Sequence, residues 1–468
     1  MSRPDARGIL FLCVSTLISL CWGIALERSS PFGMLDFKGV YYGAQCLLNQ
    51  CDPYDVPSLQ NFYLQHGGQP PSSAVNARKL MVVSLYINSP FTFLFIAPLA
   101  LLRWSLAQTV WMILIAVGLI ASSVLMWVEG RVHSQNAALL FACAALLNCE
   151  LLIAGGNTAG FVVSACVLSA WCILRDSNVA FGVLALAVAM LIKPHVAGPI
   201  WCCFFFSGSR FRKRALQTLA IAAVFALPTM LWVSHVSPHW RSEMQTNLTS
   251  ISSNSGINSP EPFSVGMSNP DCIVDLQTVL SIFVPQPFLY NALTYLVCGA
   301  LFLIWVRNAI QANASTDDLW LSLAFVVPLT LLFTYHRIHD CKVMLLTIPA
   351  CTRLWARRGV IGWLALLING LAIFATSEIP STFLVGATNR LQFAQASIAQ
   401  KIALLPLARS APLLLLAMAI FYLVIYLSES KSQTSYERST RDIDRVSLGR
   451  PHHSAIKATG NLAKHASA

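Results

Sequence analysis

A carboxylate and two tyrosines follow the first apolar run of the chain at close spacing. Asp36 stands shortly after that run, and Tyr41 and Tyr42 come soon behind it. A partly desolvated carboxylate can take a proton from a hydroxyl, so Asp36 is a candidate general base. The tyrosine rings could stack on the apolar face of a sugar ring. The same aspartate could instead cap a helix, because Asp is common at that position.

Lys193 lies inside another apolar run. Lys193-Pro194 interrupts the stretch 180–206, and the proline predicts a break in the helix there. A lysine in such a run needs an anionic partner or a water-filled cavity. A phosphate suits it, because ammonium and phosphate groups pair well. The alternative is a lysine whose long side chain reaches the membrane surface.

The segment Tyr335-His336-Arg337-Ile338-His339-Asp340 follows a further apolar run. On a helix, His336 would share a face with both His339 and Asp340. These groups could bind a metal, yet one short cluster is weak evidence for that, and we predict no metal. An Arg/His pocket for a phosphate, built on His336 and Arg337, is the preferred interpretation. The third interpretation is an ordinary polar cluster at the membrane interface, without a ligand.

Two further groups of polar residues have structural explanations. The sequence Asp52-Pro53-Tyr54-Asp55 is typical of a turn, since Asp favours its first position and Pro its second. Asn88 stands just before a proline and an apolar run, where it could cap a helix or contact a ligand.

The composition requires a membrane around these residues. Charged residues make up 11% of the 468 and hydrophobic ones 56%, and the mean hydropathy is +0.62. Soluble domains carry about 25% charged residues, whereas apolar runs of about 20 residues span a bilayer. The net charge of +11 comes from basic clusters beside apolar runs. This pattern is typical of cytoplasmic loops that contact anionic lipid headgroups, and not of nucleic-acid binding.

We predict an all-α integral membrane protein, a single helical bundle at 1–428 with about 12 transmembrane helices (range 10–13). The expected spans are 8–26, 88–102, 106–128, 136–153, 158–174, 180–206, 215–235, 286–306, 319–334, 341–356, 359–376 and 410–427. The basic clusters at 210–214 and 353–358 place both termini in the cytoplasm. The large segments 27–87, 236–282 and 377–408 then face outward.

The first outward segment is expected to carry helices at the membrane interface. The tail at 429–468 is Ser-rich and charged and is expected to be disordered and cytoplasmic. Three of the 14 cysteines, Cys46, Cys51 and Cys272, fall in outward segments, and their spacing leaves open which of them form a disulfide. Asn247 begins a glycosylation sequon whose use the sequence leaves open.

Taken in order, these motifs resemble glycosyltransferase family 87, which comprises polyprenyl-phosphate-mannose-dependent mannosyltransferases of the multispanning GT-C class. The resemblance extends over about 10–425 and rests on short motifs. They are Asp36-Phe37 with Val40-Tyr41-Tyr42, Asp52-Pro53-Tyr54, Ser89-Pro90, Gly156-Asn157, Ile192-Lys193-Pro194, and Tyr335-His336-Arg337 with Asp340.

The resemblance implies a GT-C-like bundle and one inverting displacement at the anomeric carbon of a hexose, expected to be mannose. Asp36 would deprotonate the acceptor hydroxyl, and Tyr41, Tyr42, Lys193, His336 and Arg337 would bind substrate. Secondary candidates are Asn88, Asn157, His339 and Asp340. The polyprenyl-phosphate sugar would be a co-substrate, so no cofactor is expected. The acceptor would be a glycolipid or glycan, reached on the outer face of the plasma (inner) membrane.

A transporter or flippase of a lipid-linked or amphiphilic substrate is the competing hypothesis. Such proteins often have paired broken helices in related halves. The break at Lys193-Pro194 has no evident counterpart in the sequence, and the long first outward segment with its carboxylate favours an enzyme.

Overall fold

The apolar runs of the chain form helices, as a lipid environment demands of a backbone that must satisfy its own hydrogen bonds. The computed structural model describes residues 6–253, 258–260, 273–311, 315–378, 380, 383, 387, 391 and 396–448, with side chains as far as 430. No strand occurs in these ranges; one isolated bridge joins Ile273 and Arg337.

Among the described residues, seven helical stretches are long and apolar enough to cross a membrane. They are α1 (Ala6–Ser29), α6 (Trp104–Gly130), α7 with α8 (Gln135–Leu147 and Glu150–Gly155), α12 (Ser209–Val236), α15 (Pro287–Gln311), α16 (Thr316–Phe333) and the first part of α21 (Ser410–Leu448). Shorter apolar helices are α9 (Ala159–Arg175), α10 (Val179–Ile192), α11 (Pro194–Phe206), α18 (Gly359–Ala375) and α20 (Ile398–Ala408). The chain is therefore an all-α, multi-pass membrane protein, as predicted.

Three expected spans have a finer structure than the sequence indicates. The stretch 180–206 divides at Lys193-Pro194 into α10 and α11, as the proline predicts. The stretch 88–102 is helical only in α5 (Thr92–Ala100), which at 1.5 Å per residue is about 14 Å long and far shorter than a bilayer. The stretch 341–356 begins as the 3-10 helix η2 (Asp340–Thr347) and continues as α17 (Ile348–Ala356).

The segment 27–87, called the first outward segment after its predicted orientation, is folded into helices. It contains α2 (Leu35–Leu48), α3 (Val56–Gln65) and α4 (Ala74–Ser84), which share an aromatic core with α5 and α6. A disulfide joins Cys46 to Cys51 at the end of α2, while Cys272 lies outside the described residues. Asp52 accepts hydrogen bonds from the following backbone and Asp55 caps α3, so both form the turn predicted for them.

The second outward segment lies against the first. Helix α13 (Trp240–Ser252) brings Asn247 to the carbonyls of Tyr54 and Tyr86, at 3.0 and 3.2 Å. The amide of Asn247 is buried, so this sequon is not accessible in the folded protein. A short helix, α14 (Gln277–Leu280), ends the segment.

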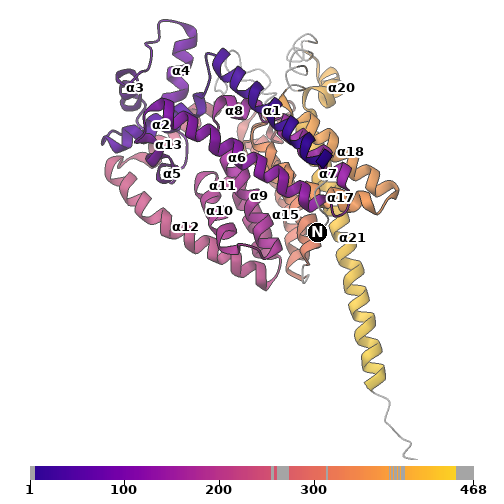
Figure 1. Ribbon diagram of the computed structural model, residues 1–468. Coiled ribbons are helices and arrows are strands. Elements are labelled where there is room, and N and C mark those ends of the chain that lie inside the picture. Colours follow the sequence, from indigo (N-terminus) through magenta and orange to yellow (C-terminus); the bar gives the residue numbers. More distant parts are fainter. Residues whose placement is uncertain are drawn as a thin grey trace, which may run out of the picture.

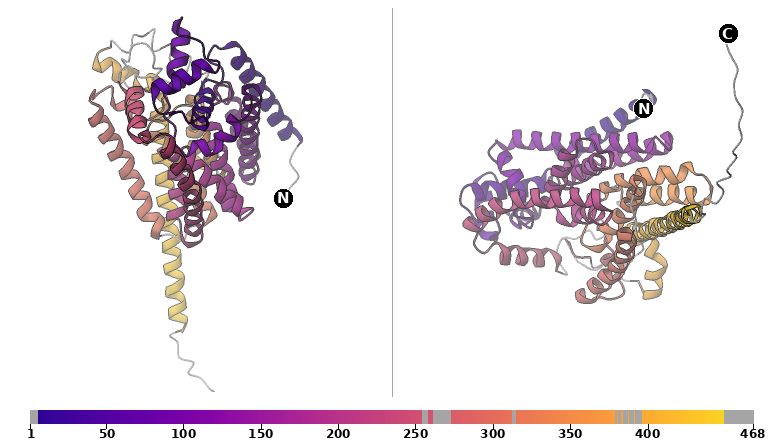
Figure 2. Two further views of the ribbon diagram at one scale, coloured as in Figure 1. Left: turned by 90° about the vertical axis from the view of Figure 1, so that its left-hand side faces the viewer. Right: turned by 90° about the horizontal axis from the view of Figure 1, so that it is seen from below.

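Helices α2, α3, α4 and α13 gather at one end of the molecule, and the long helix α21 projects from the opposite end (Figures 1 and 2). Between these ends, α16 is buried along nearly its whole length among α11, α15 and α21. Helix α21 continues to Leu448, so 429–448 of the expected tail is helical, and 449–468 lies outside the described residues.

Candidate active site

Four polar side chains from distant parts of the chain form a continuous line of hydrogen bonds. Asn157 donates from Nδ2 to Asp36 Oδ2 at 2.8 Å and accepts from Lys193 Nζ at 3.2 Å through Oδ1. Lys193 Nζ also lies 2.9 Å from Asp340 Oδ1. One amide therefore separates the carboxylate of Asp36 from the ammonium of Lys193.

Asp36 does not cap the helix in which it lies. Helix α2 begins at Leu35, and Met34, in a left-handed conformation, takes the cap position without a side-chain hydrogen bond. The carboxylate of Asp36 is partly exposed and turns toward Asn157. The helix-cap alternative considered for Asp36 is therefore wrong.

Trp111 of α6 holds both sides of this contact. Its ring stacks on Phe37 at a centroid distance of 5.1 Å, and its Nε1 donates to the carbonyl of Gly156 at 2.8 Å. Phe37 follows Asp36 in sequence and Gly156 precedes Asn157. The tryptophan thus fixes the two segments that carry the carboxylate and the amide.

Gly156 permits the close approach of α8 to α2. Its φ of +64° is left-handed, and a Cβ there would lie 2.9 Å from the Phe37 Cβ and from the Met34 side chain. The Met34 N–H also donates to the Ala154 carbonyl at 2.7 Å. A larger residue at 156 would push Asn157 away from Asp36.

Lys193 occupies the break between α10 and α11. Pro194 starts α11 and ends the hydrogen-bond ladder of α10, which turns Lys193 out of helical geometry. Its ammonium is engaged in the interior by Asn157 and Asp340 and does not extend to the membrane surface.

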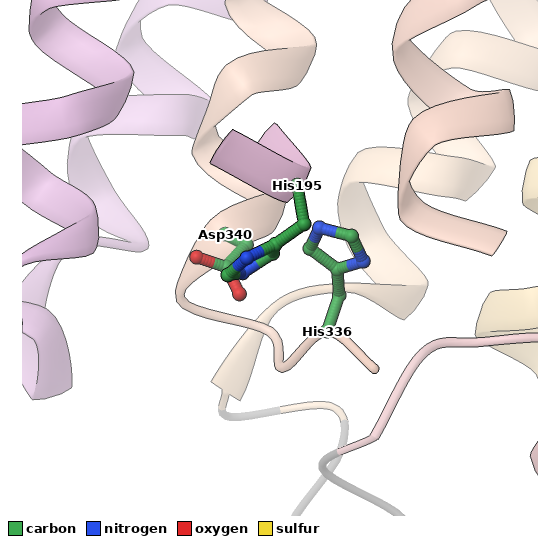
Figure 3. Close-up of side chains that lie close together, drawn as sticks. All are labelled: His195, His336 and Asp340. Carbon is green, nitrogen blue, oxygen red and sulfur yellow. The ribbon is translucent and has the colours of Figure 1, made fainter. Parts of the chain in front are cut away.

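His195, His336 and Asp340 lie close together (Figure 3), and Asp340 also contacts Lys193. Their ligand atoms lie within 4.8 Å of one another, and the two rings are 5.0 Å apart between centroids. His336 is fully buried; its Nδ1 lies 2.8 Å from the Thr334 carbonyl, and its Nε2 has no hydrogen-bond partner among the described residues. The residues 334–339 are not helical, so their turn, rather than a shared helical face, brings His336 to Asp340.

Arg337 is held next to this group by a small polar network. Its guanidinium donates to the Tyr335 hydroxyl and to Asn258 Oδ1, which also accepts from Tyr335 at 2.7 Å. A neighbouring segment holds the backbone of the same turn, because the Val274 N–H donates to the His336 carbonyl at 3.0 Å.

The electrostatics of the group follow from burial and from Lys193. Burial alone would raise the pKa of Asp340, but Lys193 and the two histidines hold that pKa below its usual value. Burial lowers the pKa of His336, against the opposing effect of Asp340. Burial raises the pKa of Tyr335 to about 12, Arg337 acts in the opposite direction, and Asp340 and Asp36 add to the increase. Asp340 is thus anionic, and Tyr335 is a neutral hydroxyl.

The other predicted site residues lie elsewhere. The hydroxyl of Tyr41 donates to the Leu102 carbonyl at 2.7 Å, and that of Tyr42 to the His66 carbonyl at 3.3 Å. The carbonyl of Asn88 accepts from Tyr54, and His339 turns toward Glu378. The structure does not bring these four to the hydrogen-bonded line, and a role for them in binding substrate stays a prediction.

Two residues of this region were missed in the sequence. His195 lies two positions after Lys193, and its place at a break in an apolar run is a signal that could have identified it. Asn258 lies in a segment rich in Ser and Asn, where nothing in its type or spacing distinguishes it.

A comparison with protein families matches residues 86–334 to the model of glycosyltransferase family 87. The match covers more than half of the chain. The chain belongs to glycosyltransferase family 87. It is therefore a membrane glycosyltransferase, which acts on a sugar donor and an acceptor within or beside the bilayer. No curated protein and no solved structure matches it.

The family match includes only part of the hydrogen-bonded line. Asn157 and Lys193 fall inside 86–334, whereas Asp36, His336 and Asp340 lie on either side of it. The geometry rather than the match connects these outer residues to the glycosyltransferase region.

Proposed function

We propose that the chain transfers a hexose, specifically mannose, from a polyprenyl-phosphate sugar to an acceptor hydroxyl by a single inverting displacement. The observation that carries this proposal is the placement of Asn157 between Asp36 and Lys193. A base for the acceptor and a cation for the leaving phosphate stand on two sides of one amide. The acceptor would be a glycolipid or glycan.

In the proposed reaction, Asp36 takes the proton of the acceptor hydroxyl. The acceptor oxygen forms a bond to the anomeric carbon while the bond from that carbon to the phosphate oxygen breaks. The electron pair of the broken bond leaves with the polyprenyl phosphate, and the anomeric configuration inverts because the acceptor attacks from the opposite face. A phosphate is already a good leaving group, and one carboxylate is enough, whereas glycoside hydrolases employ two.

Cationic groups would stabilise the charge that develops on the departing phosphate. Lys193, Arg337 and His336 are the candidates. The Nδ1–H of His336 donates to the Thr334 carbonyl, so Nε2 of the neutral ring can only accept a hydrogen bond. A phosphate oxygen at Nε2 would therefore require the imidazolium form, and donor binding would be accompanied by proton uptake.

The cluster of His195, His336 and Asp340 fits an anion better than a metal ion. The only carboxylate of the three already pairs with the Lys193 ammonium at 2.9 Å, and a divalent cation would stand next to that charge. Like charges this close repel strongly in a poorly solvated site. We therefore assign the cluster to phosphate recognition without a metal or other cofactor.

The proposed site faces outward from the plasma membrane, with both termini in the cytoplasm. The Cys46–Cys51 disulfide near Asp36 supports this orientation, because disulfides persist in oxidising compartments. The basic clusters at 210–214 and 353–358 support it as well.

The proposal is tested with purified protein reconstituted in liposomes and supplied with radiolabelled polyprenyl-phosphate mannose and a panel of glycolipid acceptors. Transfer is expected from this donor, with inversion at the anomeric carbon and with no effect of a chelator. Transfer from a nucleotide sugar instead would contradict the donor class. Loss of activity in chelator, restored by Mn²⁺, would contradict the phosphate assignment of the histidine cluster.

A further inference from the structure

A second group of titratable side chains is buried beside the candidate active site. Glu150 and Glu378 are each 3% exposed and Lys342 is 5% exposed, while the His339 side chain is 15% exposed. Burying charged groups is costly unless they are paired, so a buried cluster of this kind indicates a structural or functional role. None of the four residues belongs to the line from Asp36 to Asp340.

Glu378 joins two separate segments with its two carboxylate oxygens. Oε2 accepts a hydrogen bond from the Leu151 N–H at 3.0 Å, and Oε1 lies 3.3 Å from His339 Nδ1. Burial alone would raise the pKa of Glu378, but Lys342 and His339 hold that pKa below its usual value. The side chain is therefore an anion, which accepts a hydrogen bond from Leu151 and lies at ion-pair distance from His339.

Both segments lead directly into the active-site line. Leu151 is in the first turn of α8, and that short helix ends at Gly155, just before Gly156 and Asn157. His339 directly precedes Asp340, the partner of Lys193. Glu378 comes from a third part of the chain, after α18, so it connects three elements near the two ends of the line.

We propose that Glu378 is a positioning residue of the transferase site, which through Leu151 and His339 keeps Asn157 against Asp36 and Asp340 against Lys193. This inference rests on the proposed function. Glu378 itself touches neither substrate.

The test compares Glu378→Gln with Glu378→Leu in reconstituted protein. Gln can still accept from Leu151 and keeps a polar group beside His339, so kcat should stay within about threefold of wild type. Leu fills a similar volume but makes neither contact, and misplacement of reacting groups by about 1 Å can lower the rate by about 100-fold. We expect Glu378→Leu to lower kcat at least about 30-fold, with the acceptor KM changed less than about threefold.

A double-mutant cycle with Asn157→Leu separates positioning from general damage to the fold. If Glu378 acts through Asn157 as well as through His339, adding Glu378→Leu to Asn157→Leu should lower kcat only by the about three- to tenfold expected of the His339 contact, and not by the about 30-fold expected in the wild-type background. Glu129→Leu is the matched control, because Glu129 is a buried carboxylate that pairs with Arg175 at 2.7 Å, away from the site. It should lower the unfolding temperature without changing kcat.

Wild-type kcat in folded Glu378→Leu, or fully additive losses in the cycle, would overturn the inference. If Glu378→Leu does not fold, His339→Ala removes one of the two contacts; it should lower kcat about three- to tenfold, and an unchanged kcat would overturn the inference. Asp36→Asn is measured in parallel. Its full activity would refute the proposed function, whereas an inactive Asp36→Asn with normal Glu378→Leu would refute only this inference.

Discussion

At the scale of single residues, Asp36 owes its orientation to Asn157 rather than to its own helix. The hydrogen bond from Asn157 occupies Oδ2, and among the described residues no contact engages Oδ1. Oδ1 is therefore the oxygen that we expect to meet the acceptor hydroxyl.

Donor binding should depend on pH through His336. In the free protein, burial lowers the pKa of His336, so the ring is neutral at neutral pH. A bound phosphate would favour the imidazolium and raise that pKa, so affinity should increase as the pH falls. We expect the donor KM to fall about three- to tenfold from pH 8 to pH 6, up to the limit of tenfold per unit for one proton. His336→Gln should show a flat profile, and an equally steep profile in that variant would contradict the assignment.

Lys193 and Asp340 should be coupled in stability. Lys193→Gln leaves the Asp340 carboxylate buried without its ion pair, which should lower the free energy of unfolding by about 3 kcal/mol. Lys193→Gln with Asp340→Asn removes both charges and should regain most of that loss, while transfer stays low in both variants because the phosphate has lost its cation. Thermal unfolding in detergent measures the first effect. Equal stability of the single and double variants would argue against a buried ion pair.

The sequence identified several residues of the hydrogen-bonded line but not the contacts between them. Polar groups in a strongly apolar chain are few, and their burial in a membrane is energetically costly. For this reason the sequence identified Asp36, Lys193, His336 and Asp340. The meeting of Asp36 and Lys193 through Asn157 was not predictable, because it depends on the tertiary approach of α2, α8 and α10. Glu378 went unnoticed although it stands at the end of an apolar run, where a carboxylate is costly.

At the scale of elements, the short helix α8 provides one of the contacts between the first outward segment and the bundle. Gly156→Ala should disturb it, because a left-handed φ disfavours a side chain and the added Cβ would meet Phe37 at 2.9 Å. We expect an unfolding free energy lower by about 2 kcal/mol and a kcat lower by about tenfold. Gly299→Ala in α15 is the control, since its Cβ would meet nothing within 4 Å. Wild-type kcat in a folded Gly156→Ala protein would contradict the role of this glycine.

Hydropathy predicted helices well and their lengths less well. The break at Lys193-Pro194 followed from proline chemistry, which is local. The short extent of α5 and the 3-10 geometry of η2 were not predictable, because an apolar run looks alike whether it spans a bilayer or lies within the protein. The folded state of 27–87 depends on long-range contacts among aromatic residues, which leave no period in the sequence.

At the scale of the whole molecule, the account depends on which end faces outward. Helices α2 to α4 and the projecting part of α21 lie at opposite ends (Figure 2). Gln69→Cys and Lys213→Cys place a thiol at exposed positions in the first outward segment and at the start of α12. We expect an impermeant maleimide to label residue 69 in intact cells and residue 213 only after permeabilisation. The reverse pattern would contradict the outward-facing site.

The fold class and the family could be predicted from the sequence, because the composition indicates a helical membrane protein and the ordered motifs indicate the family. Which end faces outward is a prediction from the charges beside the apolar runs, which act through the bilayer rather than through packing. The donor sugar and the acceptor remain proposals, since recognition of a particular sugar depends on contacts that neither motif order nor charge specifies.

The most direct test of the central claim separates binding from chemistry in Asp36→Asn. The amide keeps the shape of the carboxylate but cannot take the acceptor proton. General-base catalysis contributes about 10²–10⁴-fold, so transfer in liposomes should fall by about 10³-fold. Binding of polyprenyl-phosphate mannose, measured on the same preparation, should stay within about threefold because Lys193, His336 and Arg337 are intact. Full turnover by Asp36→Asn would contradict the account.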